Sequence, residues 1–127
     1  MKNVKQVIVV RKDLRLKKGK IASLASHAAM QFILDNNESE RSDELQVKLS
    51  QQEVEWLKGS FDRDVLGIDS QDALSDMVLR AELSGINVYS IFDASKKPDE
   101  GHQLVCAAFG PDDEDQLAQI IGSLKSI

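Results

Sequence analysis

VIVVRKDLRLKKGKIASLASHAA, residues 7–29, decides the fold of this chain. The run KQVIVVR at 5–11 is β-branched and does not alternate with polar residues, which predicts a central strand covered on both faces in a partly parallel sheet. The apolar residues that follow recur at steps of three and four, which predicts a helix over 19–35 that Asn36 and Asn37 end. A strand, a basic loop and a helix start in this order build a site that faces an anion.

Positive charge is concentrated at the start of the chain. Residues 1–20 hold eight of the sixteen basic residues and one acid, Asp13, for a net charge of +7. Because the whole chain carries −5, the remaining 107 residues carry −12. This division predicts an anionic partner that docks in a defined orientation, although charge runs are often only solvated. The basic residues are Lys2, Lys5, Arg11, Lys12, Arg15, Lys17, Lys18 and Lys20.

The rest of the chain alternates between strand and helix patterns. Ser50 and Glu53 fit a capping box that opens a short helix, and Asp69 or Ser70 can cap a helix that stops at Gly85. The polar stretch 36–43 predicts a loop with local disorder. Strands are expected over 64–68, 87–92 and 103–109, the last ended by the Gly-Pro pair at 110–111, and a final helix carries its buried stripe at 117, 120, 121 and 124.

This order, β-α-α-β-α-β-β-α, predicts one α/β domain over 1–127: a three-layer α/β/α fold with a four-stranded mixed sheet. The apolar and charged fractions, 42% and 29%, are ordinary for a soluble globular protein. Neither a membrane-spanning run nor a signal peptide is evident, so we expect a cytoplasmic protein. The single cysteine, Cys106, lies in an apolar run and is expected in the core.

Three stretches together resemble the type 2 peptidyl-tRNA hydrolases. These are residues 7–29, the segment DVLGIDSQDALSDMVLRAELSGINVYSIFDAS, and the closing segment AAFGPDDEDQLAQIIGSLKSI. The match spans nearly the whole chain except about 36–60, and its Gly-Lys, Ser-His-Ala, Asp-Ala and Gly-Pro elements fall at the family's intervals. The resemblance implies a compact α/β hydrolase, often a homodimer, that needs no metal or cofactor and cleaves the ester between a peptide and the terminal ribose of tRNA.

Lys20 and Asp93 are the candidate catalytic residues. Lys20 opens the predicted helix, where its ammonium adds to the positive end of the helix dipole and suits a phosphate or a developing oxyanion. Asp93 ends a strand, and the resemblance implies that it orients or activates the attacking water. An exposed lysine in a first turn and an aspartate that starts a turn are the simpler interpretations.

Further residues are candidate contacts for the tRNA substrate. Arg11, Lys12, Lys17 and Lys18 would hold the acceptor end through phosphates, because no aromatic residues interleave with them for base stacking. His27 lies seven residues after Lys20, nearly on the same helix face, where it either borders one groove or packs inside. Ser95 and Lys97 follow Asp93 and complete the predicted binding set.

The chain departs from the family pattern at several of these positions. Leu24 replaces a glutamine, Ser95 replaces the glycine of the Asp-Ala-Gly turn, and Lys97 and Pro98 stand where the family has a threonine and a glutamine. Val105 replaces a second threonine and cannot hydrogen-bond through its side chain. Since hydroxyls can position water or ribose, these changes put the rate of hydrolysis in doubt.

Three other functions remain open from the sequence. The chain could be an RNA-binding module that has lost catalysis, a hydrolase or transferase for a small anionic ligand, or an interaction protein that uses its sheet edge or helices. Other chemistries lack their motifs, since the chain has no GxSxG elbow and no glycine-rich nucleotide loop. His27, His102 and Cys106 lack metal-ligand spacing.

Overall fold

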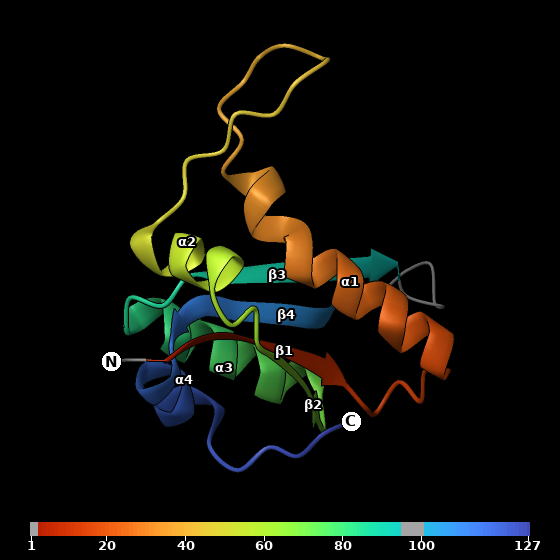
Figure 1. Ribbon diagram of the computed structural model, residues 1–127. Helices are drawn as coiled ribbons and strands as arrows, with labels where there is room; N and C mark the ends of the chain where they lie inside the picture. The colour runs from red at the N-terminus through yellow and green to blue at the C-terminus, as the bar shows by residue number, and fades with distance from the viewer. Residues whose placement is uncertain (1–2, 95–100) are drawn as a thin grey trace.

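The computed structural model describes residues 3–94 and 101–127. The elements follow the predicted order of strands and helices, as Figure 1 shows. Their bounds are β1 Val4–Arg11, α1 Lys18–Asp35, α2 Gln51–Lys58, β2 Arg63–Ile68, α3 Gln71–Leu83, β3 Val88–Ala94, β4 His102–Asp113 and α4 Glu114–Ile121. Within the described parts of the chain, no helix is both long and apolar enough to cross a membrane.

The four strands form one mixed sheet in the order β2-β1-β4-β3. β1 runs parallel to β2 and antiparallel to β4, and β3 is antiparallel to β4. The prediction that the first strand is central is therefore confirmed. β1 and β3 both run antiparallel to β4, so the carboxyl ends of β1 and β3 lie at the same end of the sheet.

Helices cover both faces of the sheet, and the three-layer fold predicted from sequence is confirmed. Alternate residues of β1 serve two separate cores, which is why its sequence is apolar without a break. Figure 1 shows α1 and α2 on one face and α3 and α4 on the other. The α1-side core includes Ile8, Val10, Leu24, Ala28, Phe32, Trp56, Tyr89, Val105 and Cys106, and the α3-side core includes Val7, Val9, Leu74, Met77, Leu104 and Leu117.

The helix α2 is fixed at both ends of its short length. Ser50 and Glu53 form the predicted capping box, and Glu53 is buried. Trp56 packs edge-on against Phe32 of α1, with ring centroids 6.0 Å apart. The Trp56 indole N–H donates to the carbonyl of Asp62 at 2.7 Å, so a buried donor is satisfied and α2 is tied to the turn before β2.

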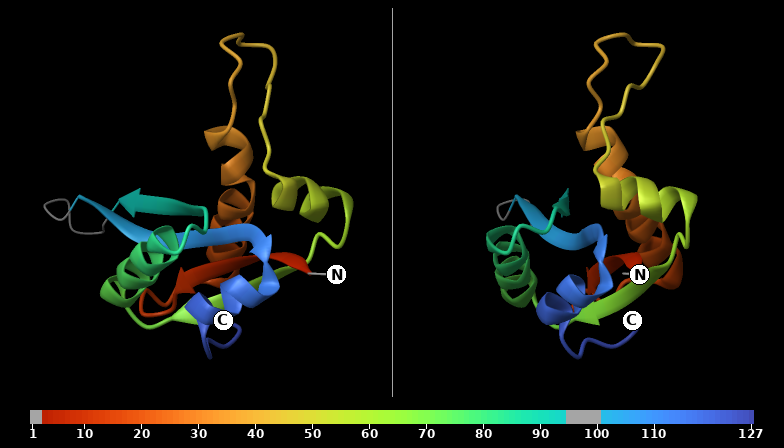
Figure 2. Two further views of the ribbon diagram at one scale, coloured as in Figure 1. Left: turned by 90° about the vertical axis from the view of Figure 1, so that its left-hand side faces the viewer. Right: turned by 60° about the vertical axis from the view of Figure 1, so that its left-hand side comes forward.

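The segment between α1 and α2 leaves the body of the molecule. Figure 2 shows it projecting beyond the end of α1 in both views. The loop predicted over 36–43 is confirmed, and the local disorder expected there stays a prediction. Asn37 forms an isolated bridge with Val47, and Arg41 hydrogen-bonds Asp43 through two nitrogens.

The strand β4 is longer than the sequence predicted. We expected it to end at the Gly-Pro pair, whereas pairing with β1 continues through Lys5 with Asp112 and Val4 with Asp113. Gly110 makes this possible because it adopts a φ of 85°, and a Cβ there would lie 2.6 Å from the backbone nitrogen of Asp112. The pair is therefore an irregularity within the strand, and the prediction that it ends β4 was wrong.

Candidate active site

Lys20 and Asp93 meet at the carboxyl edge of the sheet. The Lys20 Nζ lies 3.1 Å from an Asp93 carboxylate oxygen, and the two side chains are 49% and 45% exposed. Lys20 is in the first turn of α1, and Asp93 is near the end of β3. The fold thus places an ammonium and a carboxylate, 73 residues apart in sequence, together at a solvent-accessible position.

The loop between β1 and α1 turns its basic side chains outward. Leu14 and Leu16 are partly buried against the α1-side core, whereas Arg15 and Lys17 between and after them are exposed. Arg15 takes a positive φ of 52°, and its backbone N–H donates to the carbonyl of Lys12 at 3.1 Å. The two leucines therefore anchor the loop and leave its charges in solvent.

The start of α1 suits an anion. Lys17 occupies the N-cap position, its side chain makes no capping hydrogen bond, and the first turn holds no acidic residue among the described positions. No described atom lies within 4 Å of a Cβ placed on Gly19. Helix N–H groups without a side-chain cap can donate to a phosphate or an oxyanion.

Three predicted binding lysines lie on the surface next to this helix start. Lys17 and Lys18 are exposed. Lys12 is also exposed but its Nζ lies 3.2 Å from a carboxylate oxygen of Asp69. Lys17 and Lys18 therefore stand beside Lys20 at the helix start, while Lys12 is partly neutralised.

Arg11 differs from the lysines because its guanidinium points into the protein. Its side chain is 8% exposed and forms a two-point contact with Asp13, at 3.1 and 2.7 Å. It also donates to the backbone carbonyl of Leu104 at 3.1 Å and to the side chain of Gln103 at 3.4 Å. The hydrogen bond from Arg11 lowers the pKa of the Asp13 carboxyl. Four of the five guanidinium donors are thus used within the chain.

Of the remaining predicted binding residues, one lies on the surface of α1 and two lie outside the described residues. His27 is exposed on α1, so the alternative that it packs in the interior was wrong, and it lies about two helical turns beyond Lys20. Ser95 and Lys97 lie outside the described residues. The described residues contain no group of three or more His, Cys, Asp or Glu side chains that could hold a metal ion.

Two glutamines near the site were missed by the sequence analysis. Gln103 is the direct partner of Asp93 across the β3–β4 ladder, and directly paired residues share one face of a sheet. Gln71, at the start of α3, accepts a hydrogen bond from the backbone N–H of Leu104 at 2.7 Å. Neither glutamine belongs to a sequence motif. The signal that could have pointed to Gln103 is the run QLVCAAF, in which polar and apolar residues do not alternate as they do in a regular half-buried strand.

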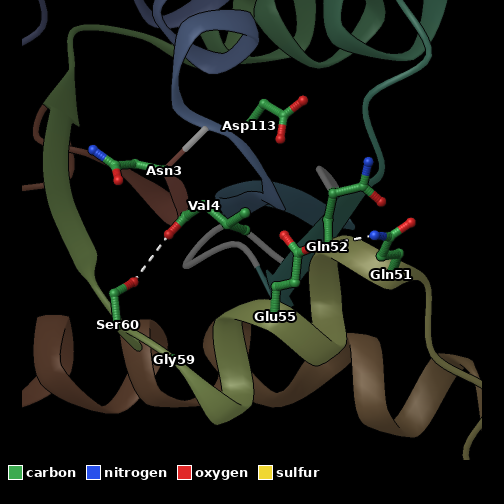
Figure 3. Close-up of a pocket in the computed structure, with 8 residues that line it drawn as sticks. All are labelled: Asn3, Val4, Gln51, Gln52, Glu55, Gly59, Ser60 and Asp113. Atoms are coloured by element: carbon green, nitrogen blue, oxygen red, sulfur yellow. Dashed lines mark hydrogen bonds between the residues drawn. The ribbon is translucent and has the colours of Figure 1, made fainter. Parts of the chain in front are cut away.

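A separate hollow of about 640 Å³ lies at the opposite end of β1. Figure 3 shows it between α2, the start of β1 and the end of β4. Its charged lining residues are Glu55 and Asp113. Because both are acidic, this hollow does not suit the small anionic ligand considered from the sequence.

Comparison with known proteins identifies the family. Residues 4–127 match the family described as "Peptidyl-tRNA hydrolase PTH2". The chain belongs to this family. A peptidyl-tRNA hydrolase of Methanothermobacter thermautotrophicus is 32% identical over 122 residues, covering 96% of this chain and 98% of the relative. One of Nanoarchaeum equitans is 34% identical over 124 residues, covering 96% and 97%.

The PTH2 family match confirms the resemblance found in the sequence, including the region 36–60 that had not suggested it. Two of the positions at which the resemblance implied a polar residue, 24 and 105, lie in the interior of the protein. Val105 is 5% exposed and belongs to the α1-side core, so this position supplies packing and no hydroxyl. Leu24 is likewise buried in that core.

Proposed function

We propose that this protein hydrolyses the ester bond of peptidyl-tRNA and releases the peptide and the tRNA. The observation that carries the proposal is the 3.1 Å contact between Lys20 and Asp93 beside the start of α1, in a chain of the PTH2 family. An exposed ion pair of this kind contributes little to stability, about 0–1 kcal/mol. Its accessibility therefore fits a chemical role better than a structural one.

In the proposed reaction, Asp93 orients a water molecule and accepts its proton as the water oxygen attacks the ester carbonyl. The carbonyl becomes a tetrahedral oxyanion, which the Lys20 ammonium and the N–H groups at the start of α1 stabilise. The bond between the carbonyl carbon and the ribose oxygen then breaks. The proton held by Asp93 passes to that ribose oxygen, so the peptide leaves as an acid and the tRNA as an alcohol.

The tRNA would be held mainly through its phosphates. Lys17 and Lys18 are exposed beside Lys20, and Lys12 lies in the preceding loop. Contacts of this kind position the substrate without reading its sequence. We include His27, Ser95 and Lys97 as further substrate contacts on the strength of their places in the sequence next to the catalytic pair.

A non-catalytic RNA-binding role is the alternative to be tested, because Val105 is buried and supplies no hydroxyl where the resemblance implies a threonine. A single-turnover assay with N-acetylated aminoacyl-tRNA separates the two. Release of the acyl group by the wild type, and its loss in Asp93→Asn with tRNA affinity retained, would support the hydrolase. Salt-sensitive binding without any release would support the binding module.

We also propose a cytoplasmic location, because ribosomes produce peptidyl-tRNA there.

We propose in addition that the protein forms a homodimer through β3. The outer edge of β2 is occupied by the end of the chain, because Gly67 donates to Lys125 and Leu66 bridges Ser126. β3 is the other edge strand of the sheet, and its Phe92 is 59% exposed. Light scattering of the wild type and Phe92→Lys would test the dimer, which requires twice the mass of the chain in the first and not in the second.

A further inference from the structure

The strand β4 contains one extra residue beside the candidate site. Ile91 of β3 pairs with Cys106, but the next residue, Phe92, pairs with Leu104, so Val105 has no partner on β3. Such a β-bulge bends the strand and turns the residues beyond it to the other face. Bulges are over-represented next to active sites, where they redirect a side chain.

The bulge determines which side chain stands next to Asp93. Val105 and Cys106 both contact the α1-side core, whereas Leu104 belongs to the α3-side core. Gln103 is therefore returned to the α1 face, where it pairs directly with Asp93. In a regular ladder with period two, Asp93 would pair with Leu104 instead.

Two side chains hold the backbone at this bulge. The N–H of Leu104 donates to the Gln71 side-chain oxygen at 2.7 Å, and its carbonyl accepts from Arg11 at 3.1 Å. Leu104 is 6% exposed and the Arg11 side chain 8%. A buried backbone group that loses its partner is costly, so these contacts fix one arrangement of the bulge.

Arg11 also links the bulge to the site directly. Its guanidinium donates to the Gln103 side-chain oxygen at 3.4 Å as well as to the Leu104 carbonyl, and Asp13 holds the guanidinium from the other side. One arginine thus contacts both the backbone of the bulge and the side chain that the bulge directs toward Asp93.

We propose that Arg11 and Gln71 are positioning residues, which fix the β4 bulge through Leu104 and so keep Gln103 beside Asp93. The inference rests on the proposed hydrolase function. In this proposal Arg11 fixes the backbone of β4 inside the protein, whereas the sequence predicted that it contacts the tRNA. It also assigns a role to Gln71, which lies on a different layer of the fold from Lys20.

Gln71 provides the cleaner test, because Arg11 also holds the loop through Asp13. Gln71→Met removes the oxygen that accepts from Leu104 at nearly constant size, and Gln71→Glu keeps such an oxygen. Ser70→Ala is the matched control. It removes the neighbouring cap, in which the Ser70 hydroxyl accepts from Ala73 at 3.1 Å, and leaves the Leu104 contact intact. All three variants are compared with the wild type as full-length chains.

We expect Gln71→Met to lower kcat for N-acetylated aminoacyl-tRNA by about 10- to 100-fold with KM nearly unchanged, because small displacements of catalytic groups are costly. Gln71→Glu should stay within about threefold of the wild type, because its carboxylate can still accept from Leu104. A need for correct packing alone would not explain a difference between the two variants, since methionine and glutamate are both close to glutamine in size. Ser70→Ala should lower the melting temperature by a few degrees without lowering kcat. The Leu104 amide should exchange faster in Gln71→Met alone.

Equal kcat values for Gln71→Met and Ser70→Ala would overturn the proposal while leaving the hydrolase function intact. A kcat of Gln71→Glu as low as that of Gln71→Met would also overturn the proposal. If the wild type itself does not cleave the substrate, the proposed function fails separately. The amide resonances of Leu104, Gln103 and Asp93 then decide the anchoring, and identical spectra for wild type and Gln71→Met would refute it.

Discussion

Replacing Lys20 by glutamine separates the chemical and structural contributions of the ion pair at the candidate site. The change removes the ammonium that lies 3.1 Å from Asp93 and keeps a polar side chain of similar reach. Both partners are about half exposed, so the free energy of unfolding should fall by less than about 1 kcal/mol. Loss of one group that stabilises an oxyanion usually raises the barrier by about 2.7–4 kcal/mol, or 10²–10³ in kcat.

The chain offers a closely matched control on the far side of the sheet. Arg80 and Asp76 on α3 form an ion pair at the same distance, 3.1 Å, and Arg80 is 49% exposed, as Lys20 is. Arg80→Gln should therefore produce a similarly small change in stability. Because α3 covers the other face of the sheet, the same substitution there should leave hydrolysis unchanged.

The assay follows release of the acyl group from N-acetylated aminoacyl-tRNA in single turnover, at enzyme concentrations that saturate the substrate. Urea titrations of both variants measure the free energy of unfolding under the same conditions. At saturation, a weaker affinity for tRNA cannot imitate a slower chemical step. Titrating the enzyme concentration gives the affinity separately.

Two results would refute the reasoning. If Lys20→Gln reacts within about fivefold of the wild type, the ammonium does not stabilise the transition state. If Arg80→Gln slows the reaction as much as Lys20→Gln does, the loss reflects the general loss of an ion pair. A loss confined to affinity would reassign Lys20 to substrate binding.

Three further results are expected. The double variant Lys17→Gln, Lys18→Gln should lose two phosphate contacts, so the slope of log affinity against log salt concentration, measured by filter binding, should decrease in magnitude by about 1.4–1.8. Its rate at saturation, measured in single turnover, should be unchanged. Burial raises the pKa of Tyr89 to about 12, so the folded state keeps a proton that the unfolded state loses near pH 10, and stability should fall as pH rises from 10 to 12. Burial raises the pKa of Cys106 to about 12 as well, so denaturation of Tyr89→Phe should show a smaller fall over this range than the wild type, and an equal fall would contradict the prediction. We expect Val105→Thr to raise kcat and lower the melting temperature, because it places at a buried position the hydroxyl that the resemblance implies there. An unchanged kcat would show that this hydroxyl is not needed.

The first half of the site could be predicted because its signals are local. The β-branched run of β1 and the helical spacing of α1 each depend on neighbours within a few residues, and both elements were placed within one or two residues of their observed bounds. The capping box of α2 was likewise predicted, since Ser50 and Glu53 make their reciprocal hydrogen bonds within four residues.

The register of β3 and β4 could not be predicted, because it depends on contacts between distant segments. Leu104 is held by Arg11, 93 residues away, and by Gln71, 33 residues away. Alternation alone would have placed Val105 and Cys106 on opposite faces, yet both contact the α1-side core. The continuation of β4 past Gly110 has the same origin, since it depends on pairing with the start of β1.

Charge counting in the first twenty residues predicted an anion site but overstated its extent. The acid of this segment, Asp13, binds Arg11, and Lys12 is paired with Asp69 from the end of β2. These two contacts partly offset the positive charges nearest to the strand. The exposed positive charge of the segment is therefore concentrated at the start of α1, where Lys17 and Lys18 lie beside the helix N–H groups. A phosphate bound there would lie next to the Lys20–Asp93 pair, so the fold narrows a diffuse basic segment to one docking position.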